Sequence, residues 1–454
     1  MDTPYVSLSE FNYVIERPDC TLGYNLNSGN FIILDQLSCQ VLRAEVAIEQ
    51  LPSDSLGFLE SAGFLVRTNE RKAIELRLSK FRKPTFYSHI VITPTIACNF
   101  RCGYCFQNDM RASDQMSDEI FDRVIEYLIG SVSAEHRNLK LTWFGGEPLL
   151  AIDRIEQFNV KLVKALGVAK MPIQDMITNG SLLDESVTQR LIVMGIKKIQ
   201  VSFDSVVFKK GTHRGIVNED GSPSIIASNA LKAIAAGLSI VARVNVDARN
   251  TDLIPKLATA LDTVGLSRCA YYARVDDDNG GANIPIRYSS TNRIPIIEVV
   301  DESHVTISRA EFAAREKQLL FNQANFALLL DKLKPRLHFC GATDGSMMVI
   351  SPLGGVSRCW NSAGRVDEEI CNILEPNALE TLGLGPISEQ WDSYSAFDHD
   401  GCRDCKVLPL CMGGCSHPRT MLEISQPPCT PVKYYIDDLV RYVGTHLSIE
   451  GRKQ

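Results

Sequence analysis

The feature that most constrains the fold is an alternation of short apolar strands with amphipathic helical patterns between residues 88 and 275. A strand followed by a helix and then by another strand is typical of parallel β structure with right-handed crossovers. The predicted strands are residues 90–95, 139–144, 173–178, 196–203, 240–246 and 268–275. The predicted helices between them are residues 117–128, 153–166, 184–194, 222–236 and 251–264. The fold class is therefore α/β.

The composition limits the class of protein. A chain of 454 residues holds two or three domains at about 150 residues each. Its net charge of −7 argues against nucleic-acid binding, which needs a basic surface. No apolar run approaches the ~20 residues of a membrane span, and the first residues lack the pattern of a secretory signal. We therefore expect a cytoplasmic protein without a membrane or nucleic-acid partner.

Three cysteines, Cys98, Cys102 and Cys105, directly follow the first predicted strand. The chain has 14 cysteines, and the cytoplasm keeps thiols reduced, so their clustering indicates metal rather than disulfides. A structural zinc site needs four ligands, whereas an iron–sulfur cubane held by three thiolates leaves one iron open. Half a zinc site, or three unrelated cysteines, is the alternative interpretation.

The three cysteines have C-x3-C-x2-C spacing, with Tyr104 before the last of them, and Gly145-Gly146-Glu147-Pro148 follows the next predicted strand. This combination resembles the radical S-adenosylmethionine (SAM) enzymes. The resemblance implies that Cys98, Cys102 and Cys105 hold a catalytic [4Fe–4S] cluster whose open iron chelates SAM. Reductive cleavage of SAM then gives methionine and a 5′-deoxyadenosyl radical, which abstracts hydrogen from the substrate. The implied fold is a partial (β/α)6 barrel similar to a TIM barrel, with its catalytic groups at the carboxyl ends of the strands.

The same resemblance implies a SAM pocket at the ends of the predicted strands. Gly145, Gly146 and Glu147 are expected near the amino group of SAM, and Arg243 offers a planar cation to its carboxylate. The other expected cofactor-binding residues are Tyr104, Thr178, Asn179, Ser202 and Asp204. Side chains of these types at strand ends also serve as caps and ion pairs, which is the alternative.

A second cysteine group lies in the C-terminal part of the chain. Its members are Cys340, Cys359, Cys402, Cys405, Cys411, Cys415 and Cys429. Their order and spacing resemble the SPASM extension of radical SAM enzymes, which holds two auxiliary [4Fe–4S] clusters. The resemblance implies that Cys402, Cys405, Cys411 and Cys429 close one cluster, and that Cys340, Cys359 and Cys415 hold the other, nearer the active site. For the fourth position of this nearer cluster three alternatives stay open: Cys371, His338 or an open iron.

The first 85 residues form a separate pattern. Residues 22–26 and 30–34 flank Asn27-Ser28-Gly29 and predict a hairpin. Helices are expected at residues 35–50 and 55–62, followed by a strand at 63–66. This order resembles a winged-helix-like leader-recognition module, and a packing domain without a ligand is the alternative. The expected domains are a small N-terminal module (1–85), a radical SAM barrel (86–300), a bridging helix (301–335) and an auxiliary-cluster domain with a C-terminal helix (336–454).

These resemblances imply an oxidoreductase that matures a ribosomally made peptide by forming a cross-link, a thioether or an epimer. Its expected partners are a precursor peptide or protein and an electron donor such as flavodoxin or ferredoxin. One alternative is a sulfatase-maturing, formylglycine-generating enzyme. Members of that group carry an aspartate directly after the cysteine that corresponds to Cys359, whereas Trp360 and Asn361 follow here. A second alternative is a non-catalytic iron–sulfur scaffold.

Overall fold

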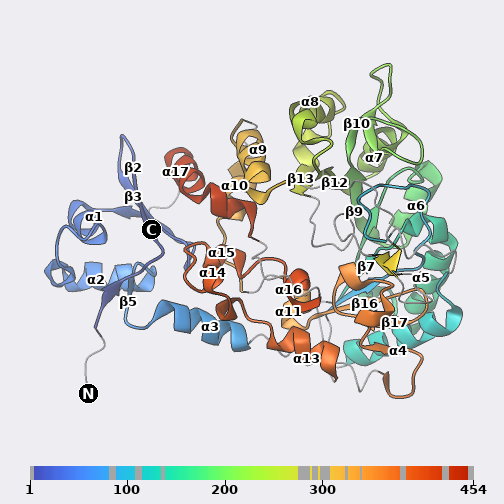
Figure 1. Cartoon of the computed structure of the whole chain (residues 1–454), viewed down its shortest axis with the longest axis horizontal. Helices are drawn as coiled ribbons and strands as arrows, with labels where there is room; N and C mark the ends of the chain where they lie inside the picture. Colours follow the sequence, from blue (N-terminus) through green and yellow to red (C-terminus); the bar gives the residue numbers. More distant parts are fainter. Residues whose placement is uncertain are drawn as a thin grey trace.

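The computed structural model describes residues 5–80, 88–107, 115–133, 139–274, 287–288, 295–296, 307–322, 326–337, 340–378, 385–421 and 429–447. Figure 1 shows the N-terminal module at one end of the longest axis and the barrel at the other. Most of the C-terminal helices lie between these two parts. None of the described helices combines the length and the apolar character needed to cross a bilayer.

The barrel is built on a sheet of nine described strands in the order β13-β12-β9-β8-β7-β6-β16-β17-β18. Six of them run parallel in barrel order, which confirms the predicted α/β class. Their bounds are β6 His89–Ile92, β7 Lys140–Trp143, β8 Ile173–Thr178, β9 Ile196–Phe203, β12 Ser239–Val246 and β13 Ala270–Arg274. The connecting helices are α4 Asp118–Ser133, α5 Ile152–Leu166, α6 Glu185–Val193, α7 Ile225–Ala235 and α8 Ile254–Thr263.

One face of this sheet is covered by the connecting helices (Figure 1). Side chains alternate between the two faces of a strand, so Leu141 and Trp143 of β7 face the same way and are fully buried. The Trp143 ring meets Phe158 of α5 edge-on at a centroid distance of 5.3 Å. Thr142 lies between these two residues and faces the inside of the barrel, where it is hydrogen bonded to His89 at 2.8 Å. The inner face of the sheet therefore carries polar side chains such as Thr142 and His89.

The C-terminal segment completes this sheet. Strand β16 (Met347–Ile350) pairs in parallel with β6, with Val349 opposite Val91. Strands β17 (Gly355–Ser357) and β18 (Cys371–Asn372) then extend the edge in antiparallel order. The sequence predicts a separate domain from residue 336 onward and does not predict that one of its strands pairs with the barrel sheet. The hairpin carries Cys359, just after β17, to the edge of the barrel.

The N-terminal module contains a three-stranded antiparallel sheet of β2 (Asn12–Glu16), β3 (Thr21–Asn25) and β4 (Phe31–Leu34). The predicted hairpin is confirmed as β3 and β4. The helix predicted over residues 35–50 is wrong in length, because α1 spans only Gln36–Leu42. Ala44 takes a left-handed conformation (φ 59°), which ends the helix. Helix α2 (Ser53–Ser61) and the short pair of β1 (Ser7–Leu8) with β5 (Leu65–Val66) complete the module.

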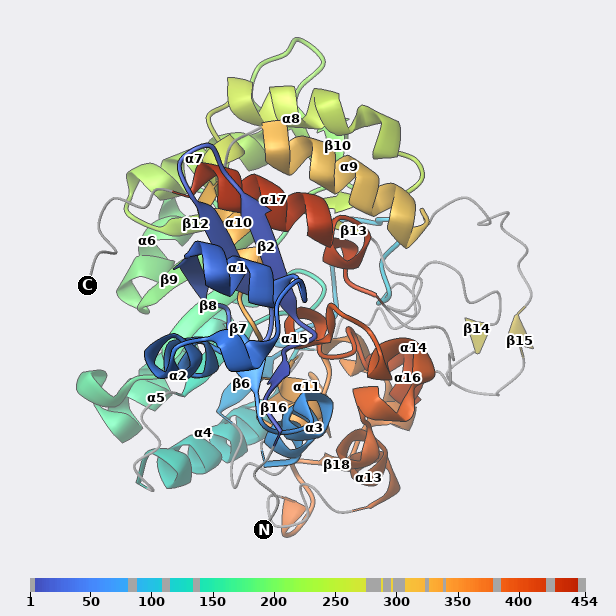
Figure 2. The same ribbon diagram turned by 90° about the vertical axis from the view of Figure 1, so that its left-hand side faces the viewer.

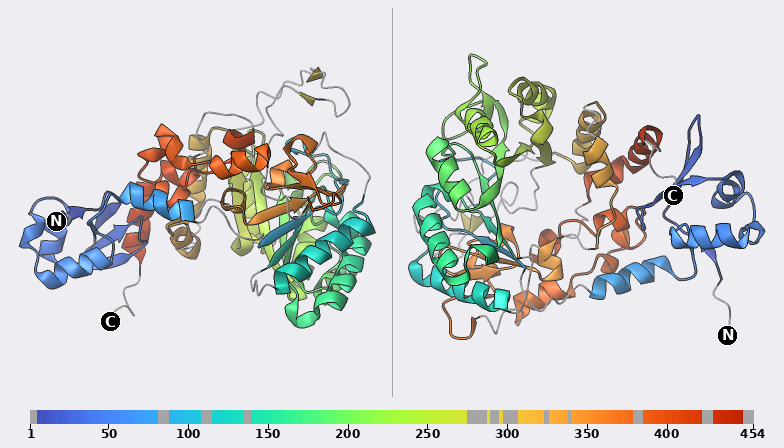
Figure 3. Two further views of the ribbon diagram at one scale, coloured as in Figure 1. Left: turned by 90° about the horizontal axis from the view of Figure 1, so that it is seen from below. Right: turned by 180° about the vertical axis from the view of Figure 1, so that it is seen from behind.

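The module shares a core with the C-terminal part of the chain. Helix α17 (Ile436–His446) packs on β2 and β3, as Figure 2 shows. Tyr13 of β2 donates a hydrogen bond of 2.9 Å from its hydroxyl to Asp437. Helix α3 (Glu70–Lys80) runs beside the C-terminal segments (Figure 3). Arg71 of α3 donates a hydrogen bond of 3.4 Å to the carbonyl oxygen of Cys405.

In the region of the bridging helix predicted between residues 301 and 335, the described residues form two helical segments. They are α9 (Arg309–Asn322) and α10 (Phe326–Lys332), and the three residues between them lie outside the described part. The short C-terminal helices are α11 Gly341–Asp344, α13 Pro386–Ser393, α14 Asp400–Arg403, α15 Leu408–Cys411 and α16 His417–Met421. The remaining strands are β10 Ser205–Val207, β11 Gly215–Val217, β14 Arg287–Tyr288 and β15 Pro295–Ile296.

Candidate active site

A cavity of about 480 Å³ opens at the inner face of the barrel. Its lining includes most of the residues that the sequence predicts for the SAM site and for the nearer auxiliary cluster. These lining residues are Cys98, Cys102, Tyr104, Cys105, Gly145, Gly146, Thr178, Asn179, Ser202, Arg243, Cys340, Cys359 and Cys415. Two predicted residues, Glu147 and Asp204, are placed behind the lining rather than on it.

The loop after β6 presents the first three thiols to this cavity. The backbone N–H of Phe100 donates to the Cys98 sulfur at 3.4 Å, and the Asn179 amide donates to the same sulfur at 4.0 Å. Burial raises the pKa of the Cys102 thiol to about 11, and the Arg214 guanidinium opposes this shift. Three thiols at one edge of a ligand-sized cavity, with N–H donors to the Cys98 sulfur, fit the three-cysteine cluster expected here.

Gly145 and Gly146 shape this cysteine loop by close packing. The N–H of Gly146 donates to the carbonyl oxygen of Thr95 at 3.2 Å, and the N–H of Glu147 donates to that of Ala97 at 2.9 Å. A Cβ at Gly146 would lie 2.7 Å from the carbonyl carbon of Ala97 and would overlap its oxygen. The family resemblance implies one reason for glycine here, because these residues are expected near the amino group of SAM. The structure adds a second reason, because the cysteine loop itself occupies the space of their missing side chains.

Glu147 is fully buried and acts as a connector between two strand ends. Its carboxylate accepts hydrogen bonds from the Thr178 hydroxyl (2.7 Å), the Asn179 N–H (2.7 Å) and the Leu149 N–H (3.0 Å). Burial raises the pKa of Glu147 to about 7, and these three donors oppose the shift. The carboxylate therefore positions Thr178 and Asn179, both of which line the cavity.

Replacing Glu147 by Gln is expected to loosen this connection. The amide nitrogen of glutamine cannot accept a hydrogen bond, so a buried donor loses its partner at a cost of about 1–3 kcal/mol in the free energy of unfolding. Because the folded state raises the pKa of Glu147, the carboxyl stabilises the fold fully below its unfolded pKa of 4.5, and this contribution is lost as the pH rises to about 7. Chemical denaturation across that range should show a steeper decline in the wild type than in Glu147→Gln, in which the raised pKa of Asp204 still contributes. Glu185→Gln, on the exposed first turn of α6, is the control.

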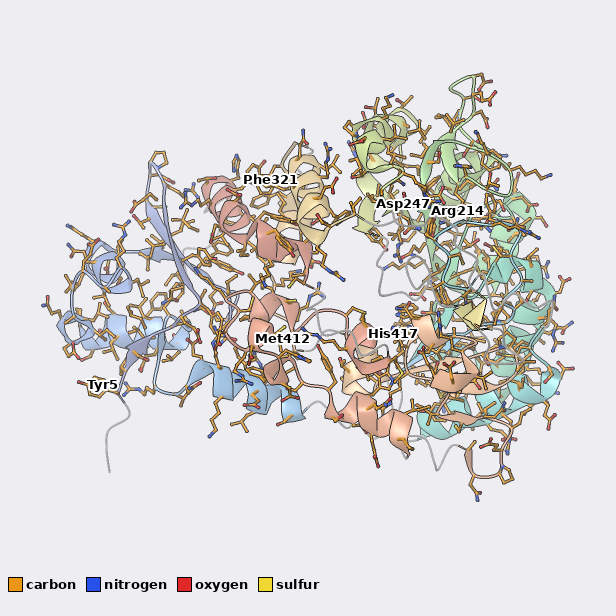
Figure 4. The ribbon with its side chains drawn as sticks, in the orientation of Figure 1. Tyr5, Arg214, Asp247, Phe321, Met412 and His417 are labelled. Atoms are coloured by element: carbon orange, nitrogen blue, oxygen red, sulfur yellow. The ribbon has the colours of Figure 1, made fainter. Side chains whose placement is uncertain are left out.

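A buried network supports Tyr104 at the ends of β9 and β12. The Tyr104 hydroxyl donates to Asp204 at 2.8 Å and accepts from the Asn245 amide at 3.1 Å. The backbone N–H and the Nε of Arg214 donate to the same carboxylate at 2.8 and 2.9 Å. Burial raises the pKa of Asp204 to about 6. Figure 4 labels Arg214 beside Asp247 at this end of the barrel. Asp204 thus holds Tyr104 and Arg214 in place at the cavity wall.

The fifth and sixth barrel strands supply further polar groups. Arg243 donates from Nε to the Asn245 side chain at 2.9 Å, and among the described residues no carboxylate pairs with it. The Tyr271 hydroxyl donates to Gln200 at 2.9 Å, and both residues line the cavity. Sequence reasoning missed Gln200 and Tyr271 because no motif contains them. Their inward positions on the predicted strands were the available signal.

Cys340, Cys359 and Cys415 reach the same cavity from the C-terminal segment. Burial raises the pKa of the Cys359 thiol well above its usual value, and the neighbouring Cys415 and Cys340 raise it further. Cys371 is not placed with them: it lies on β18 with its sulfur 3.8 Å from the carbonyl oxygen of Ala378. His338, the other predicted candidate for the fourth position, lies outside the described residues.

Four further cysteines line a second, smaller cavity: Cys402, Cys405, Cys411 and Cys429. Arg419 approaches the Cys402 sulfur at 3.7 Å, and the Lys433 ammonium approaches the Cys429 sulfur at 3.4 Å. Within the described ranges, no three His, Cys, Asp or Glu side chains converge on one point as the ligands of a single metal ion would. In Figure 4, Met412, next to Cys411, lies nearer the N-terminal module, and His417, two residues after Cys415, lies nearer the barrel. Four thiols with two cations fit an anionic cluster.

Comparison with known proteins agrees with this geometry. Residues 92–248 match the radical SAM superfamily. The chain is 23% identical over 366 residues to the PqqA peptide cyclase of Granulibacter bethesdensis, across 77% of this chain and 89% of that protein.

Two solved structures share the fold. Native anSMEcpe with bound AdoMet has a TM-score of 0.58 and 17% identity, over 78% of this chain and 99% of its own. Streptococcus suis SuiB bound to the precursor peptide SuiA has a TM-score of 0.51 and 14% identity, over 94% of this chain and 99% of its own. The predicted family and fold are confirmed, and the family implies a [4Fe–4S] cluster and SAM, which the cavity and its three thiols fit. Residues 92–248 of this chain therefore form a domain of the radical SAM superfamily.

Proposed function

We propose that this enzyme is a maturase of a ribosomally made peptide, on which it forms a cross-link, a thioether or an epimer. The observation that carries the proposal is that Cys98, Cys102 and Cys105 share one cavity with Cys340, Cys359 and Cys415. A peptide side chain held in this cavity would lie between a radical source and a second metal site. The PqqA peptide cyclase and SuiB with its bound precursor peptide support a peptide as the substrate class.

In this proposal each group of cavity residues has its own role. Cys98, Cys102 and Cys105 hold the first cluster, and SAM, when bound, supplies the 5′-deoxyadenosyl radical. Arg243 neutralises the SAM carboxylate, since its guanidinium faces the cavity without a carboxylate partner in the described part. The apolar side chains of Phe106, Phe144, Ile177 and Trp360 line the cavity and exclude water from the reactive centre. The remaining proposed cofactor-binding residues are Tyr104, Gly145, Gly146, Thr178, Asn179 and Ser202, with Glu147 and Asp204 as positioning residues.

Several finer assignments belong to the same proposal. The two C-terminal cysteine groups hold auxiliary [4Fe–4S] clusters, a reduced flavodoxin or ferredoxin supplies electrons, and the enzyme acts in the cytoplasm without a membrane or nucleic-acid partner. The three-stranded module within residues 1–85 recognises the leader of the peptide. Residues 86–300, 301–335 and 336–454 are the barrel, the bridge and the auxiliary-cluster domain.

The formylglycine alternative is less well supported by the cavity. Trp360, which stands where that group carries its aspartate, lines the cavity, and so does the next residue, Asn361. Among the described lining residues there is no Asp, Glu, His or Lys to act as the corresponding base.

The test uses anaerobically reconstituted enzyme with SAM, a strong reductant and short peptides encoded beside its gene. Mass spectrometry and chiral amino-acid analysis of the peptide would be combined with quantification of 5′-deoxyadenosine. We expect deoxyadenosine to form together with the loss of two hydrogens from the peptide, or with inversion of one centre. Conversion of a cysteine or serine in a sulfatase peptide to an aldehyde, with the neighbouring peptides unchanged, would instead support the formylglycine alternative.

A further inference from the structure

A basic surface surrounds the outer side of the cysteine loop, away from the cavity. Arg101 lies between Cys98 and Cys102, and its side chain is exposed. Lys209, Lys210 and His213, on the segment between β10 and β11, are exposed as well. We refer to Arg101, Lys209, Lys210 and His213 as the basic surface. Within the described residues, none of its three permanent cations has a carboxylate partner.

Backbone contacts hold these residues on one face of the molecule. The N–H of Arg101 donates to the carbonyl oxygen of Gly211 at 2.7 Å, which joins the cysteine loop to the turn that carries Lys209 and Lys210. The rings of Phe100 and Phe208 meet edge-on at a centroid distance of 6.4 Å beneath this turn. The turn itself is closed by hydrogen bonds between Lys209 and His213. The basic surface is therefore a fixed part of the loop that carries the three thiols.

The acidic groups nearby do not cancel its charge. Asp204 and Asp247 are paired with Arg214 and Arg249, so they offer little negative charge to the outside. The exposed acids closest along the chain, Glu219 and Asp220, lie beyond Val217 on a separate turn. The chain as a whole carries a net charge of −7. A local positive surface on a negative protein favours one oriented approach by an acidic partner.

We propose that the basic surface is the docking site of a small acidic electron-carrying protein with a flavin or iron–sulfur centre. The proposal rests on the proposed function, because reductive cleavage of SAM needs one electron from outside the chain. The reduced carrier would lose one electron and the cluster held by the three cysteines would gain it. The cavity side of the loop is reserved for SAM and substrate, whereas the outer side exposes Arg101 and Gly103, the two neighbours of Cys102. An electron carrier therefore has its shortest approach through the basic surface.

The test compares two double charge reversals in the reconstituted full-length enzyme. Lys209→Glu with Lys210→Glu reverses the basic surface. Lys164→Glu with Lys170→Glu is the matched control, because both lysines are exposed, Lys164 in the last turn of α5 and Lys170 just after this helix, before β8 begins at the opposite end of the barrel. Binding of oxidised flavodoxin would be measured by calorimetry at low and high salt. Deoxyadenosine formation would be measured with reduced flavodoxin and, separately, with dithionite.

We expect the Lys209/Lys210 variant to lose about 10-fold or more in flavodoxin affinity at low salt, with a smaller difference at high salt. Its flavodoxin-driven rate should fall in parallel, while its dithionite-driven rate and the behaviour of the control stay at the wild-type level. Equal flavodoxin affinity for all three proteins would overturn the docking site. Loss of the dithionite-driven reaction in the wild type would instead contradict the proposed function, so the two failures are distinguishable.

Discussion

Replacing Cys98, Cys102 and Cys105 together by alanine is expected to abolish 5′-deoxyadenosine formation while the protein stays folded. These thiols line the cavity at the end of β6, and a cluster cannot assemble there without them. If the other two cysteine groups hold cubanes, the iron content should fall from about twelve to about eight per chain. These changes would be measured by iron analysis, by the visible absorbance of the clusters and by a deoxyadenosine assay.

The matched control for this variant is replacement of Cys371 by alanine. That cysteine lies on β18 near Ala378 and does not line the cavity, so iron and activity should stay at the wild-type level. Deoxyadenosine from the triple variant, or zinc in place of iron in the wild type, would contradict the assignment of the site. Loss of one cluster's iron from Cys371→Ala would restore this residue as the missing fourth ligand.

Gly146→Ala is expected to damage the same site without touching a ligand. The new Cβ would overlap the backbone carbonyls of Ile96 and Ala97, which cannot move without shifting Cys98. A displacement of about 1 Å at a reacting centre costs about 100-fold in rate, so deoxyadenosine formation should fall by at least that factor. The first cluster should be lost or labile, and the iron of the auxiliary groups should remain.

Gly130→Ala is the control, because nothing lies within 4 Å of the position that its Cβ would take. Alanine is also favoured over glycine inside a helix such as α4, so this variant should be at least as stable as the wild type. Wild-type activity in Gly146→Ala would show that the cysteine loop can shift without loss, contrary to the packing argument. Equal loss in both variants would indicate a general effect of the substitutions on folding.

Much of the barrel could be predicted because its signals are local. The predicted limits of β8 and β9 agree with the structure at both ends. Asp184, at the start of α6, caps the helix by accepting from the N–H of Val187 at 2.8 Å. The helix predicted from residue 35 to 50 is wrong because helical periodicity does not reveal a left-handed residue such as Ala44.

Cysteine spacing was enough to predict the thiols of the site. The roles that depend on tertiary contacts could not be predicted from the sequence. The spacing placed three thiols on one loop, and the structure brings them together with Cys340, Cys359 and Cys415. The role of Glu147 could not be read from its tetrapeptide, since it depends on donors from Thr178 and Asn179 in the next loop. Likewise, only the pairing of β16 with β6 shows how Cys359 reaches the barrel.

That pairing also has a consequence for how the protein folds. Strand β6 is the first barrel strand in the chain. Among the described strands, the one that pairs with its outer edge is β16, which is made after every other barrel strand. Contacts so distant in sequence form slowly, and until then the backbone N–H and C=O groups of β6 are available to other strands. During synthesis the nascent barrel therefore carries an unprotected edge until the C-terminal segment emerges from the ribosome. Completion of the sheet also brings Cys359 to the cavity, so completion of the cavity wall and protection of this strand edge become a single late event.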